Sequence, residues 1–583
     1  MSDTLPSPLD NKAVAWTLLE IADLLELKGD NPFKIRAYRN AADVVSHAAE
    51  AVSSLDEAGL RGWNGIGKDL AGRIREITLT GDCEIRRELL TEFPATLLDV
   101  MRLQGVGPKT VAVLYRELGV RSLEDLATAA RSGKVRGIKG MGSKKEQLIL
   151  QAIEERQRFA GRHLLSRATD MAEAILAHLK EQSPTAELST VGSVRRGTET
   201  SGDLDIVATG DGSDAFAQAL IAQFTAFPLV ERVLANGATK ASVLLRGGFQ
   251  ADLRVVKPEE RGAAMQYFTG SKAHNIALRD RALARGWKLN EYGLFNEADT
   301  AIAGTTEASI YRALGLAYIE PEMRENRGEI EAAEANELPD LITRADLKGD
   351  LHMHTTSSDG RETLETMVSA AKARGLQYIA ITDHTQSLAM ANGLDEARTL
   401  EQAERVRAYS KTQKDITVLA GTECDILSDG SLDLTDDCLA SLDIVVASIH
   451  SSLAQTEAEM TARVIKAIEH PSVDIIGHLT ARMLLRRDAS KVKVEKVIDA
   501  ARANGVALEL NSQPHRLDLC DSHARLARDR GVKLVIDTDA HYVDALDYAR
   551  WGVMTARRAW VTKDDVLNTL PLKLFVKSLR RNH

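Results

Sequence analysis

The sequence predicts a multidomain chain in which a helical N-terminal part is followed by a mixed α and α/β middle part and a C-terminal α/β part, whose parallel strands either close into a barrel or form an open sheet. Three observations support this fold class. Apolar residues recur at helical spacing near the N-terminus, and a strand-like segment rich in aspartate lies near residue 205. After residue 340, seven short apolar segments alternate with helical stretches, which is the rhythm of a parallel sheet.

The composition indicates a globular protein without a membrane span. No run of about 18 apolar residues is present, and the N-terminus lacks the basic-then-apolar order of a secretory signal. The four cysteines are scattered, with no CxxC pair, which predicts a reducing, cytoplasmic location. The net charge of −10 conceals a local partition, because residues 101–150 hold ten Lys/Arg against four Asp/Glu. A basic patch of this kind can still bind phosphate, since electrostatic fields are local and screened.

Residues 1 to about 165 are expected to be short helices. The first helix is indicated by apolar residues at i, i+4, i+7 and i+11, namely Val14, Leu18, Ile21 and Leu25. Three segments then repeat a Gly–apolar–Gly turn followed by a cation and an amphipathic helix: 62–74, 103–115 and 138–150. One such turn is better explained as a tight helix connection, but three copies favour DNA.

The chemistry of these turns suits a nucleic-acid backbone. Glycines let the N–H groups of a helix N-terminus approach a phosphate closely, and nearby lysines add positive charge. Contacts of this kind are independent of base sequence. The residues expected to contact DNA here are Gly65, Gly67, Lys68, Gly105, Gly107 and Lys109.

Between about 166 and 320 the sequence carries paired carboxylates. In GDLDIV, strand alternation places Asp203 and Asp205 on one face, and Asp252 is expected on a neighbouring strand. Three carboxylates that converge on two metal ions suit in-line phosphoryl transfer. Arg195 and Arg196 precede the pair and are candidates for binding outer phosphates. A lone DxD is more often a solvated turn, but these surroundings are more specific.

The stretch GSVRRGTETSGDLDIV at 192–207 resembles the palm signature of family X DNA polymerases, the beta-type enzymes. The segment at 267–295, YFTGSKAHNIALRDRALARGWKLNEYGLF, is similar to the nucleotide-selecting segment of that family. The resemblance implies that Asp203, Asp205 and Asp252 bind Mg²⁺ or Mn²⁺. The nucleotide-binding residues that it implies are Ser193, Arg196, Gly202, Tyr267, Phe268, Gly270 and Asn275, with Arg279 at the template minor groove.

One position departs from the beta-type pattern. Where those enzymes carry the Schiff-base lysine of their deoxyribose-phosphate lyase activity, this chain has Arg73. A guanidinium stays protonated and is a poor amine nucleophile, which argues against the lyase, although Lys68 nearby leaves it open.

The last 240 residues contain ten of the 14 histidines. Metal-binding residue types stand at the carboxyl ends of six of the seven expected strands, where core packing would place leucine or valine. With one loop aspartate, the candidate ligands are His352, His354, Asp359, His384, Glu423, His450, His478, Asp539 and His541. Arg482, Arg486 and Arg487 follow in a helix-like stretch and are candidates to grip a DNA strand, or equally a solvated face.

This pattern resembles the PHP (polymerase and histidinol phosphatase) domain, with all nine ligand positions occupied. The resemblance implies a seven-stranded (β/α) barrel that cleaves phosphoesters with up to three ions. Mixed imidazole and carboxylate ligands suit Mn²⁺, Zn²⁺ or Fe²⁺. Glu423 is the expected bridging ligand.

Together the motifs resemble the bacterial and archaeal family X polymerases. The expected divisions are 1–90 (helical N-terminal domain), 91–165 (fingers), 166–260 (palm), 261–317 (thumb), 318–346 (solvated acidic linker) and 347–583 (PHP domain). The expected function is gap-filling DNA synthesis for repair, with 3′→5′ exonuclease or 3′-end processing in the PHP domain and, ranked lower, cleavage at abasic sites. The expected partners of a monomeric enzyme are gapped or primed DNA and deoxynucleoside triphosphates.

Two alternatives remain. A template-independent nucleotidyltransferase with a PHP phosphoesterase shares the GS…DxD core, but the three glycine turns and the segment at 267–295 favour templated synthesis. A non-enzymatic DNA-binding scaffold is disfavoured by the intact carboxylates and the complete ligand set.

Overall fold

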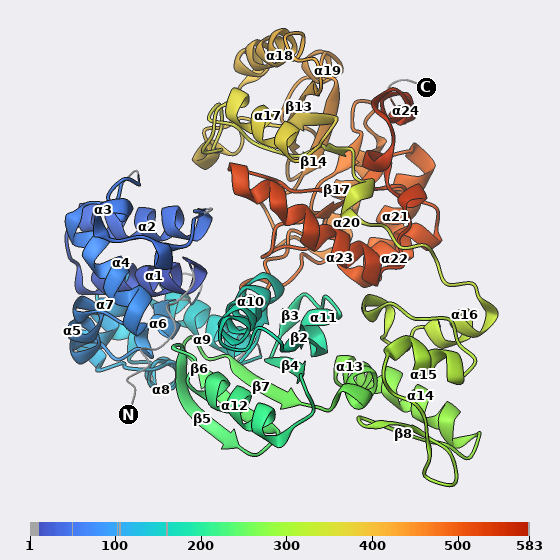
Figure 1. The fold of residues 1–583 in the computed structure, drawn as a ribbon. Coiled ribbons are helices and arrows are strands. Elements are labelled where there is room, and N and C mark those ends of the chain that lie inside the picture. Colours follow the sequence, from blue (N-terminus) through green and yellow to red (C-terminus); the bar gives the residue numbers. More distant parts are fainter. Residues whose placement is uncertain are drawn as a thin grey trace.

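The computed structural model describes residues 11–48, 50–63, 65–101, 103, 106–158 and 161–580. Figure 1 shows a helical N-terminal body beside a central sheet, a small thumb-like body, and a C-terminal α/β barrel next to the sheet. The expected fold class, with helical domains, palm, thumb and a seven-stranded barrel, is confirmed. Among the described residues, every helix is too short or too polar to span a bilayer.

The N-terminal body is built around its first helix. Leu18, Ile21 and Leu25 are fully buried, as the apolar spacing predicts. Asn31 caps the second helix by accepting the Phe33 N–H at 2.9 Å. The helices are α1 (Asn11–Lys28), α2 (Pro32–His47), α3 (Glu57–Leu60), α4 (Lys68–Thr80), α5 (Glu84–Glu92), α6 (Leu97–Met101), α7 (Pro108–Leu118), α8 (Leu123–Arg131) and α9 (Ser143–Arg158).

This body contacts the central sheet through an aromatic pair. The Trp16 ring of α1 stacks on Phe249 with centroids 6.4 Å apart, and the Arg167 guanidinium lies 5.5 Å from the Trp16 ring. Arg246 also donates to the Gly81 carbonyl at the end of α4. The helical body is therefore docked on the sheet and is more than a tethered module.

The central sheet has five strands in the order β2-β4-β7-β6-β5, and β4 and β7 are parallel neighbours. Alternate side chains of β7 are buried, and β4 alternates over its first four residues before it becomes buried on both faces, which fixes the strand register. The palm elements are α10 (Leu165–Gln182), β2 (Glu187–Thr190), α11 (Gly192–Arg195), β4 (Asp203–Thr209), α12 (Asp214–Thr225), β5 (Val230–Asn236), β6 (Lys240–Leu245) and β7 (Gln250–Val255), with a small pair β1 (His163–Leu164) and β3 (Thr200–Ser201).

The thumb-like body includes part of the segment expected to be a solvated linker. Arg324 and Glu329 are fully buried; Arg324 pairs with Glu307 at 2.6 Å, and Glu329 contacts His274 at 2.7 Å. The expectation of a solvated face is therefore wrong for these residues. The elements are α13 (Arg261–Thr269), α14 (Lys272–Leu283), β8 (Lys288–Asn290), β9 (Gly293–Phe295), β10 (Ala301–Ala303), α15 (Glu307–Ala313) and α16 (Glu329–Ala335).

The barrel has seven parallel strands in sequential order. A parallel bridge between Met353, after the first strand, and Ala540, after the last, joins the two edges of the sheet. Its strands are β11 (Gly349–Asp350), β12 (Tyr378–Ile381), β13 (Thr417–Asp425), β14 (Ile444–Ser448), β15 (Ile475–Ile476), β16 (Ala507–Asn511) and β17 (Leu534–Asp537). Its helices are α17 (Leu364–Ala373), α18 (Glu396–Ser410), α19 (Asp436–Ala440), α20 (Glu457–Glu469), α21 (Val494–Asn504), α22 (Asp521–Asp529), α23 (Ala549–Arg558) and α24 (Leu572–Ser578).

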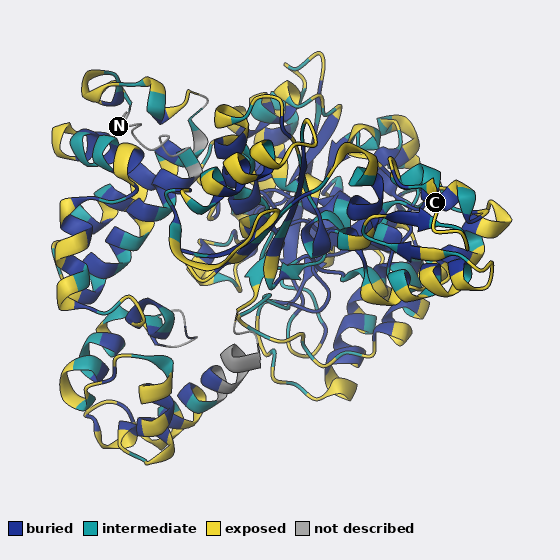
Figure 2. Cartoon of the chain, turned by 60° about the horizontal axis from the view of Figure 1, so that its bottom comes forward, coloured by how far each residue is buried: buried dark blue, intermediate teal, exposed yellow. Residues whose placement is uncertain are grey.

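The barrel interior changes character along its axis. At the amino ends of the strands it is apolar, and Phe575 of α24 stacks on Tyr378 with centroids 5.1 Å apart. The strands are buried on both faces, as Figure 2 shows, which explains their nearly continuous apolar runs. The predicted metal-ligand residues, by contrast, gather at the carboxyl ends.

Candidate functional site

The predicted aspartates lie on adjacent strands of the central sheet. Asp205 on β4 is directly opposite Asp252 on the parallel strand β7, and Asp203 shares the face of Asp205 two residues earlier. Asp203 is exposed and the other two are half-buried. Asp252 accepts hydrogen bonds from the Ser242 hydroxyl and, at 3.0 Å, from the Gln250 amide. The sheet register thus brings the three predicted residues together.

Asp205 has an unusual electrostatic setting. Burial, followed by repulsion from Asp203 and Asp252, raises the pKa of Asp205 to about 7. A Cβ on Gly192 would lie 2.5 Å from the Asp205 carboxylate, so only glycine, here with φ +65°, allows α11 to start this close. The three aspartates fit divalent cations by their chemistry, because their carboxylate oxygens repel one another and such cations prefer oxygen ligands. Among the described residues, the tightest ligand groups lie elsewhere, in the barrel.

The predicted phosphate-binding residues surround this edge. Ser193 shares a 2.6 Å hydrogen bond with Ser201, and Arg196 donates to the Thr269 carbonyl while pairing with Glu325 at 3.1 Å. Gly270, with φ +70°, lies against Arg196. Gly202 precedes the first aspartate and is half-buried. By contrast, Arg195 is held by Glu307 at 2.6 Å, so it joins palm to thumb, and its predicted phosphate role is not supported.

The predicted nucleotide-selecting residues lie on α13 and α14. Tyr267 is 41% exposed and meets Phe268 edge to face at 5.1 Å, while Phe268 also lies under the Arg254 guanidinium. Asn275 donates to the Tyr267 carbonyl at 2.7 Å and accepts from Gln266 at 2.8 Å. Arg279 is exposed on α14.

The glycine turns have open approaches. Gly67 and Gly107 cap α4 and α7 without a side-chain hydrogen bond, and a Cβ on either residue, or on Gly65, would meet nothing within 4 Å. The apolar residue between the glycines is buried in each turn: Ile66, Val106 and Met141. Lys68 and Lys109 are the first and second residues of their helices. Gly105 lies outside the described residues.

Arg73, the residue expected at the lyase position of the beta-type enzymes, lies on α4 and pairs with Asp69 at 3.2 Å. A guanidinium stays charged at neutral pH, which is consistent with the expectation that Arg73 is no nucleophile.

All nine predicted barrel ligands converge at the carboxyl ends of the strands. Glu423 lies at their centre, with carboxylate oxygens 2.8–3.5 Å from ring nitrogens of five histidines: His352, His354, His384, His450 and His478. Three compact groups are present among the described residues: His354, Asp359, His384 and His541; His352, His354 and Asp539; and His384, Glu423 and His450. His478 completes the set through its 2.8 Å contact with Glu423.

The barrel donors fit divalent cations. Several of their atoms are buried without a hydrogen-bond partner in the structure, including Nε2 of His352, both ring nitrogens of His354, Nδ1 of His384 and Oε2 of Glu423. Burial would lower the pKa of His352, but the carboxylates of Glu423, Glu509 and Asp539 raise it. Burial and the neighbouring His541 and His384 lower the pKa of His354 to about 3. Closely packed imidazole and carboxylate groups whose pKa values are shifted in opposite directions are characteristic of metal centres.

The arginines after His478 lie differently from the expectation. Residues 479–487 form turns and no helix. Arg482 pairs with Glu199 of the palm, and Arg487 donates to the Ala481 carbonyl, so neither is free to grip DNA; Arg486 is exposed.

The sequence reasoning missed a cation closer to the centre. The Arg516 guanidinium lies 3.9 Å from the Asp539 carboxylate and is 17% exposed. A signal was available, because Arg516 follows β16 and strand-end loops line the mouth of such barrels.

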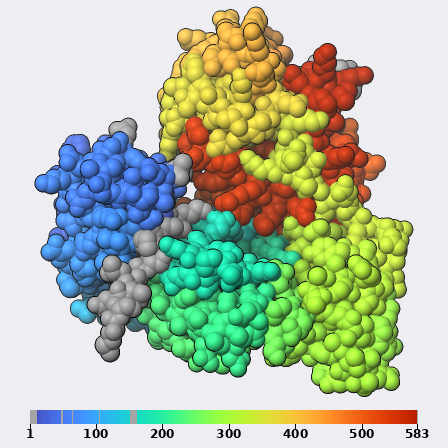
Figure 3. All heavy atoms as spheres, viewed as in Figure 1, coloured from blue at the N-terminus to red at the C-terminus, as the bar shows by residue number. Residues whose placement is uncertain are grey.

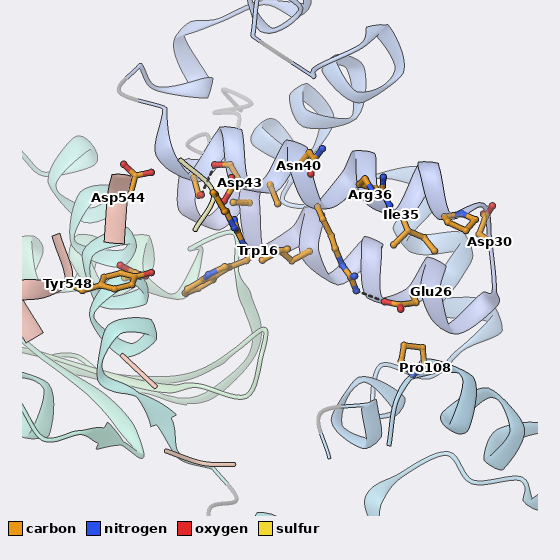
Figure 4. A pocket seen from close by; sticks show the side chains of 18 of the residues that line it. Trp16, Glu26, Asp30, Ile35, Arg36, Asn40, Asp43, Pro108, Asp544 and Tyr548 are labelled. Carbon is orange, nitrogen blue, oxygen red and sulfur yellow. Dashed lines mark hydrogen bonds and ion pairs between the residues drawn. The ribbon is translucent and has the colours of Figure 1, made fainter. Parts of the chain in front are cut away.

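A large cleft separates the helical body from the barrel mouth. Its volume is about 1470 Å³, and Figure 4 shows Trp16, Arg36 and Asp43 on one side with Asp544 and Tyr548 on the other. In the space-filling view of Figure 3 the helical body lies at the left, and the barrel lies above the palm. The cleft walls also include Arg361, whose backbone N–H is bonded to the His541 carbonyl, so the cleft reaches the neighbourhood of the barrel centre.

Family models match successive parts of the chain. The models are a helix-hairpin-helix domain at 9–83, a SAM-like helix-hairpin-helix tandem at 97–155, a DNA polymerase beta palm at 166–244, a DNA polymerase beta thumb at 264–325 and a PHP domain at 350–513.

Similar proteins fall into two groups. The chain is 39% identical to the DNA polymerase/3′-5′ exonuclease PolX of Bacillus subtilis (strain 168), over 98% of this chain and 100% of the relative. The C-terminal part alone is 30% identical to a probable phosphatase of Thermoanaerobacter sp. (strain X514), over 38% of this chain and 89% of the relative. A probable phosphatase of Shewanella sp. (strain ANA-3) is 28% identical to this part, over 40% of this chain and 92% of the relative. The chain therefore belongs to the PolX family, the family X DNA polymerases that carry a C-terminal PHP domain.

Proposed function

We propose that this chain is a DNA polymerase with a separate 3′→5′ exonuclease centre, and that it fills short gaps during DNA repair. The observation that supports the proposal is that one chain brings together two separate sets of candidate cation ligands: aspartates on β4 and β7, and nine residues at the barrel mouth. The relative from Bacillus subtilis carries both activities in its name.

In the palm, Asp203, Asp205 and Asp252 would hold Mg²⁺ or Mn²⁺. When bound, these ions activate a primer 3′-hydroxyl and stabilise charge on the leaving pyrophosphate. Ser193, Gly202 and Gly270 would present hydroxyl and backbone groups to the incoming triphosphate, and Arg196 would exchange its contact with Glu325 for a phosphate oxygen. Tyr267 and Phe268 would pack against the deoxyribose, Asn275 would face the base and Arg279 the template minor groove.

In the barrel, the nine residues from His352 to His541 would hold up to three ions, with Glu423 as the bridging ligand. Bound Mn²⁺, Zn²⁺ or Fe²⁺ supplies an acidified water and neutralises charge on the phosphodiester. Arg516 would donate to a non-bridging oxygen of that phosphodiester, because its guanidinium is directed to the same edge as Asp539 and has no bidentate partner among the described residues.

The helical body would bind the DNA backbone through its glycine turns at Gly65, Gly67, Lys68, Gly107 and Lys109, with Gly105 in the second turn. This binding is independent of sequence, as expected for an enzyme that acts on gapped or primed DNA with deoxynucleoside triphosphates. We propose that the enzyme is a cytoplasmic monomer. We rank cleavage at abasic sites below 3′-end trimming, and the Arg73–Asp69 pair argues against lyase activity.

Primer extension on a one-nucleotide gap, compared with tailing of an unpaired single strand, tests the proposal. Template-directed addition on the gap together with removal of 3′ nucleotides in the absence of triphosphates is the expected result. Addition of nucleotides without regard to the template would instead favour a template-independent nucleotidyltransferase.

A further inference from the structure

Two buried carboxylates lie beside the barrel ligands without belonging to the nine-residue set. Glu509 is on β16, the only barrel strand without a predicted ligand at its carboxyl end, and is 1% exposed. Asp425 ends β13 and is 4% exposed. Each contacts the outward nitrogen of a ligand histidine: Glu509 lies 2.7 Å from Nδ1 of His352, and Asp425 lies 2.9 Å from Nδ1 of His450.

These contacts determine which ring nitrogen carries the proton. An ionised carboxylate only accepts hydrogen bonds, so the histidine must donate its Nδ1–H to it. In the neutral imidazole, Nε2 is therefore the unprotonated nitrogen, and it faces Glu423 at 3.3 Å in both His352 and His450. A neutral imidazole with an inward lone pair is the form that binds a metal ion.

We propose that Glu509 and Asp425 are positioning residues that hold His352 and His450 in the tautomer and orientation needed to bind divalent cations. The inference rests on the proposed hydrolytic function of the barrel, and deepens it by assigning these two residues, which touch neither substrate nor reacting atoms.

The two carboxylates differ in how many of their oxygens accept hydrogen bonds from side chains or backbone of the site. The second oxygen of Glu509 accepts the His478 backbone N–H at 2.6 Å and the Asn511 amide at 3.3 Å, and Asn511 in turn donates to Asp539 at 3.0 Å. Glu509 thus connects three ligands. For Asp425, no side-chain donor reaches the second oxygen within the part of the chain that the structure describes.

This difference predicts opposite results for the two isosteric amides. In Glu509→Gln, one position holds an NH₂ group. If that group faces His352, Nδ1 must become the acceptor and the proton moves to Nε2, where it blocks the metal. If that group faces His478, its N–H and the backbone N–H of His478 are two donors pointing at each other. In Asp425→Asn, the remaining carbonyl oxygen can still accept from His450, so the contact survives.

The test is Mn²⁺ binding to the full-length, metal-stripped chain, followed through the electron paramagnetic resonance signal of free Mn²⁺. All proteins, the parent included, carry Asp205→Ala, which weakens Mn²⁺ binding by the palm aspartates. We expect Glu509→Gln, Glu509→Ala and Asp425→Ala to bind at least one Mn²⁺ about 10- to 100-fold more weakly than the parent, and Asp425→Asn to stay within about threefold of it.

The matched control is Asp474→Ala. Asp474 is a buried carboxylate of the same barrel, 3% exposed, that accepts the Val445 N–H at 2.9 Å near the amino ends of the strands. Its loss should lower the thermal midpoint without changing Mn²⁺ affinity. Parent-like Mn²⁺ binding by Glu509→Gln, or equal weakening by Asp474→Ala, would overturn the inference alone. A parent protein that binds no Mn²⁺ in the barrel would overturn the proposed hydrolytic function with it.

Discussion

Glu199, in the loop between the proposed phosphate-binding residues and the three palm aspartates, forms a two-pronged ion pair with Arg482 at the barrel mouth. The nitrogen–oxygen distances are 2.5 and 3.1 Å, and Arg482 also donates to the carbonyls of Arg516 and Leu517. The palm loop and the loop that carries Arg516 are therefore joined by one guanidinium. The two proposed centres have separate sets of ligands, but the loops beside them are linked through Arg482.

This ion pair should stabilise the palm–barrel contact. Arg482 is 13% and Glu199 25% exposed, so removing one partner leaves a largely buried charge. We expect Glu199→Ala to cost about 2 kcal/mol and to lower the first thermal transition by about 4–8 °C. Calorimetry of this variant beside Arg405→Ala, which removes the exposed ion pair between Arg405 of α18 and Glu365 of α17, checks the prediction. Equal, small shifts in the two variants would show that the palm–barrel contact contributes nothing to stability.

The pKa of Asp205 predicts a pH-dependent stability. The folded state raises this pKa from its usual 3.8 to about 7, so the folded chain binds the proton more tightly than the unfolded chain. Stability from this group is therefore present below about pH 4 and is lost as the pH rises to about 7. Metal-free Asp205→Asn should consequently melt at a higher temperature than the parent at pH 8, and at nearly the same temperature at pH 4.

The same substitution should abolish nucleotide addition, because an amide cannot replace the charge that holds the ions. Mg²⁺ should raise the melting temperature of the parent more than that of Asp205→Asn. An Asp205→Asn protein that is less stable than the parent at pH 8 would mean that the carboxylate is not under repulsion from Asp203 and Asp252.

Arg516 should act on the phosphodiester and leave the ions in place. We expect Arg516→Ala to reduce kcat/KM for 3′ trimming by about 10- to 100-fold, the value of one charge-assisted hydrogen bond. Arg516→Lys should restore part of it as a point charge. Mn²⁺ content should be unchanged in both variants; loss of Mn²⁺ would make Arg516 a support for Asp539 instead.

The glycine turns should make DNA binding sensitive to salt. Lys68→Ala and Lys109→Ala should each weaken binding of a gapped duplex and reduce the slope of log K against log salt by about one. Lys577→Ala, on α24 at the opposite end of the barrel, is the matched control. Fluorescence anisotropy over a range of KCl concentrations measures these slopes, and unchanged slopes would remove the turns from the interface.

The residues whose placement follows from the sequence share one physical cause. Strand periodicity and strand ends determine where side chains point, which is why Asp203, Asp205 and the histidines at barrel strand ends could be identified before any coordinates. Asp252 followed from its apolar flanks, and its register opposite Asp205 agrees.

The residues that sequence reasoning missed depend on tertiary partners. Nothing in the local pattern distinguishes Arg195, which binds Glu307, from Arg196, which lies beside Gly270. From the sequence, Arg482 is a candidate for a DNA contact or equally for a solvated face, and nothing singles out Glu509, because the partners of both lie far away in the sequence. The buried pair of Arg324 with Glu307 was hidden for the same reason in an acidic segment.

The most direct test of the two-centre account compares Asp205→Ala and His352→Ala on one gapped DNA substrate, with extension and 3′ trimming measured in parallel. The account predicts that Asp205→Ala loses extension and still trims, and that His352→Ala loses trimming and still extends. Loss of both activities from either single substitution, with the fold intact by circular dichroism, would contradict it.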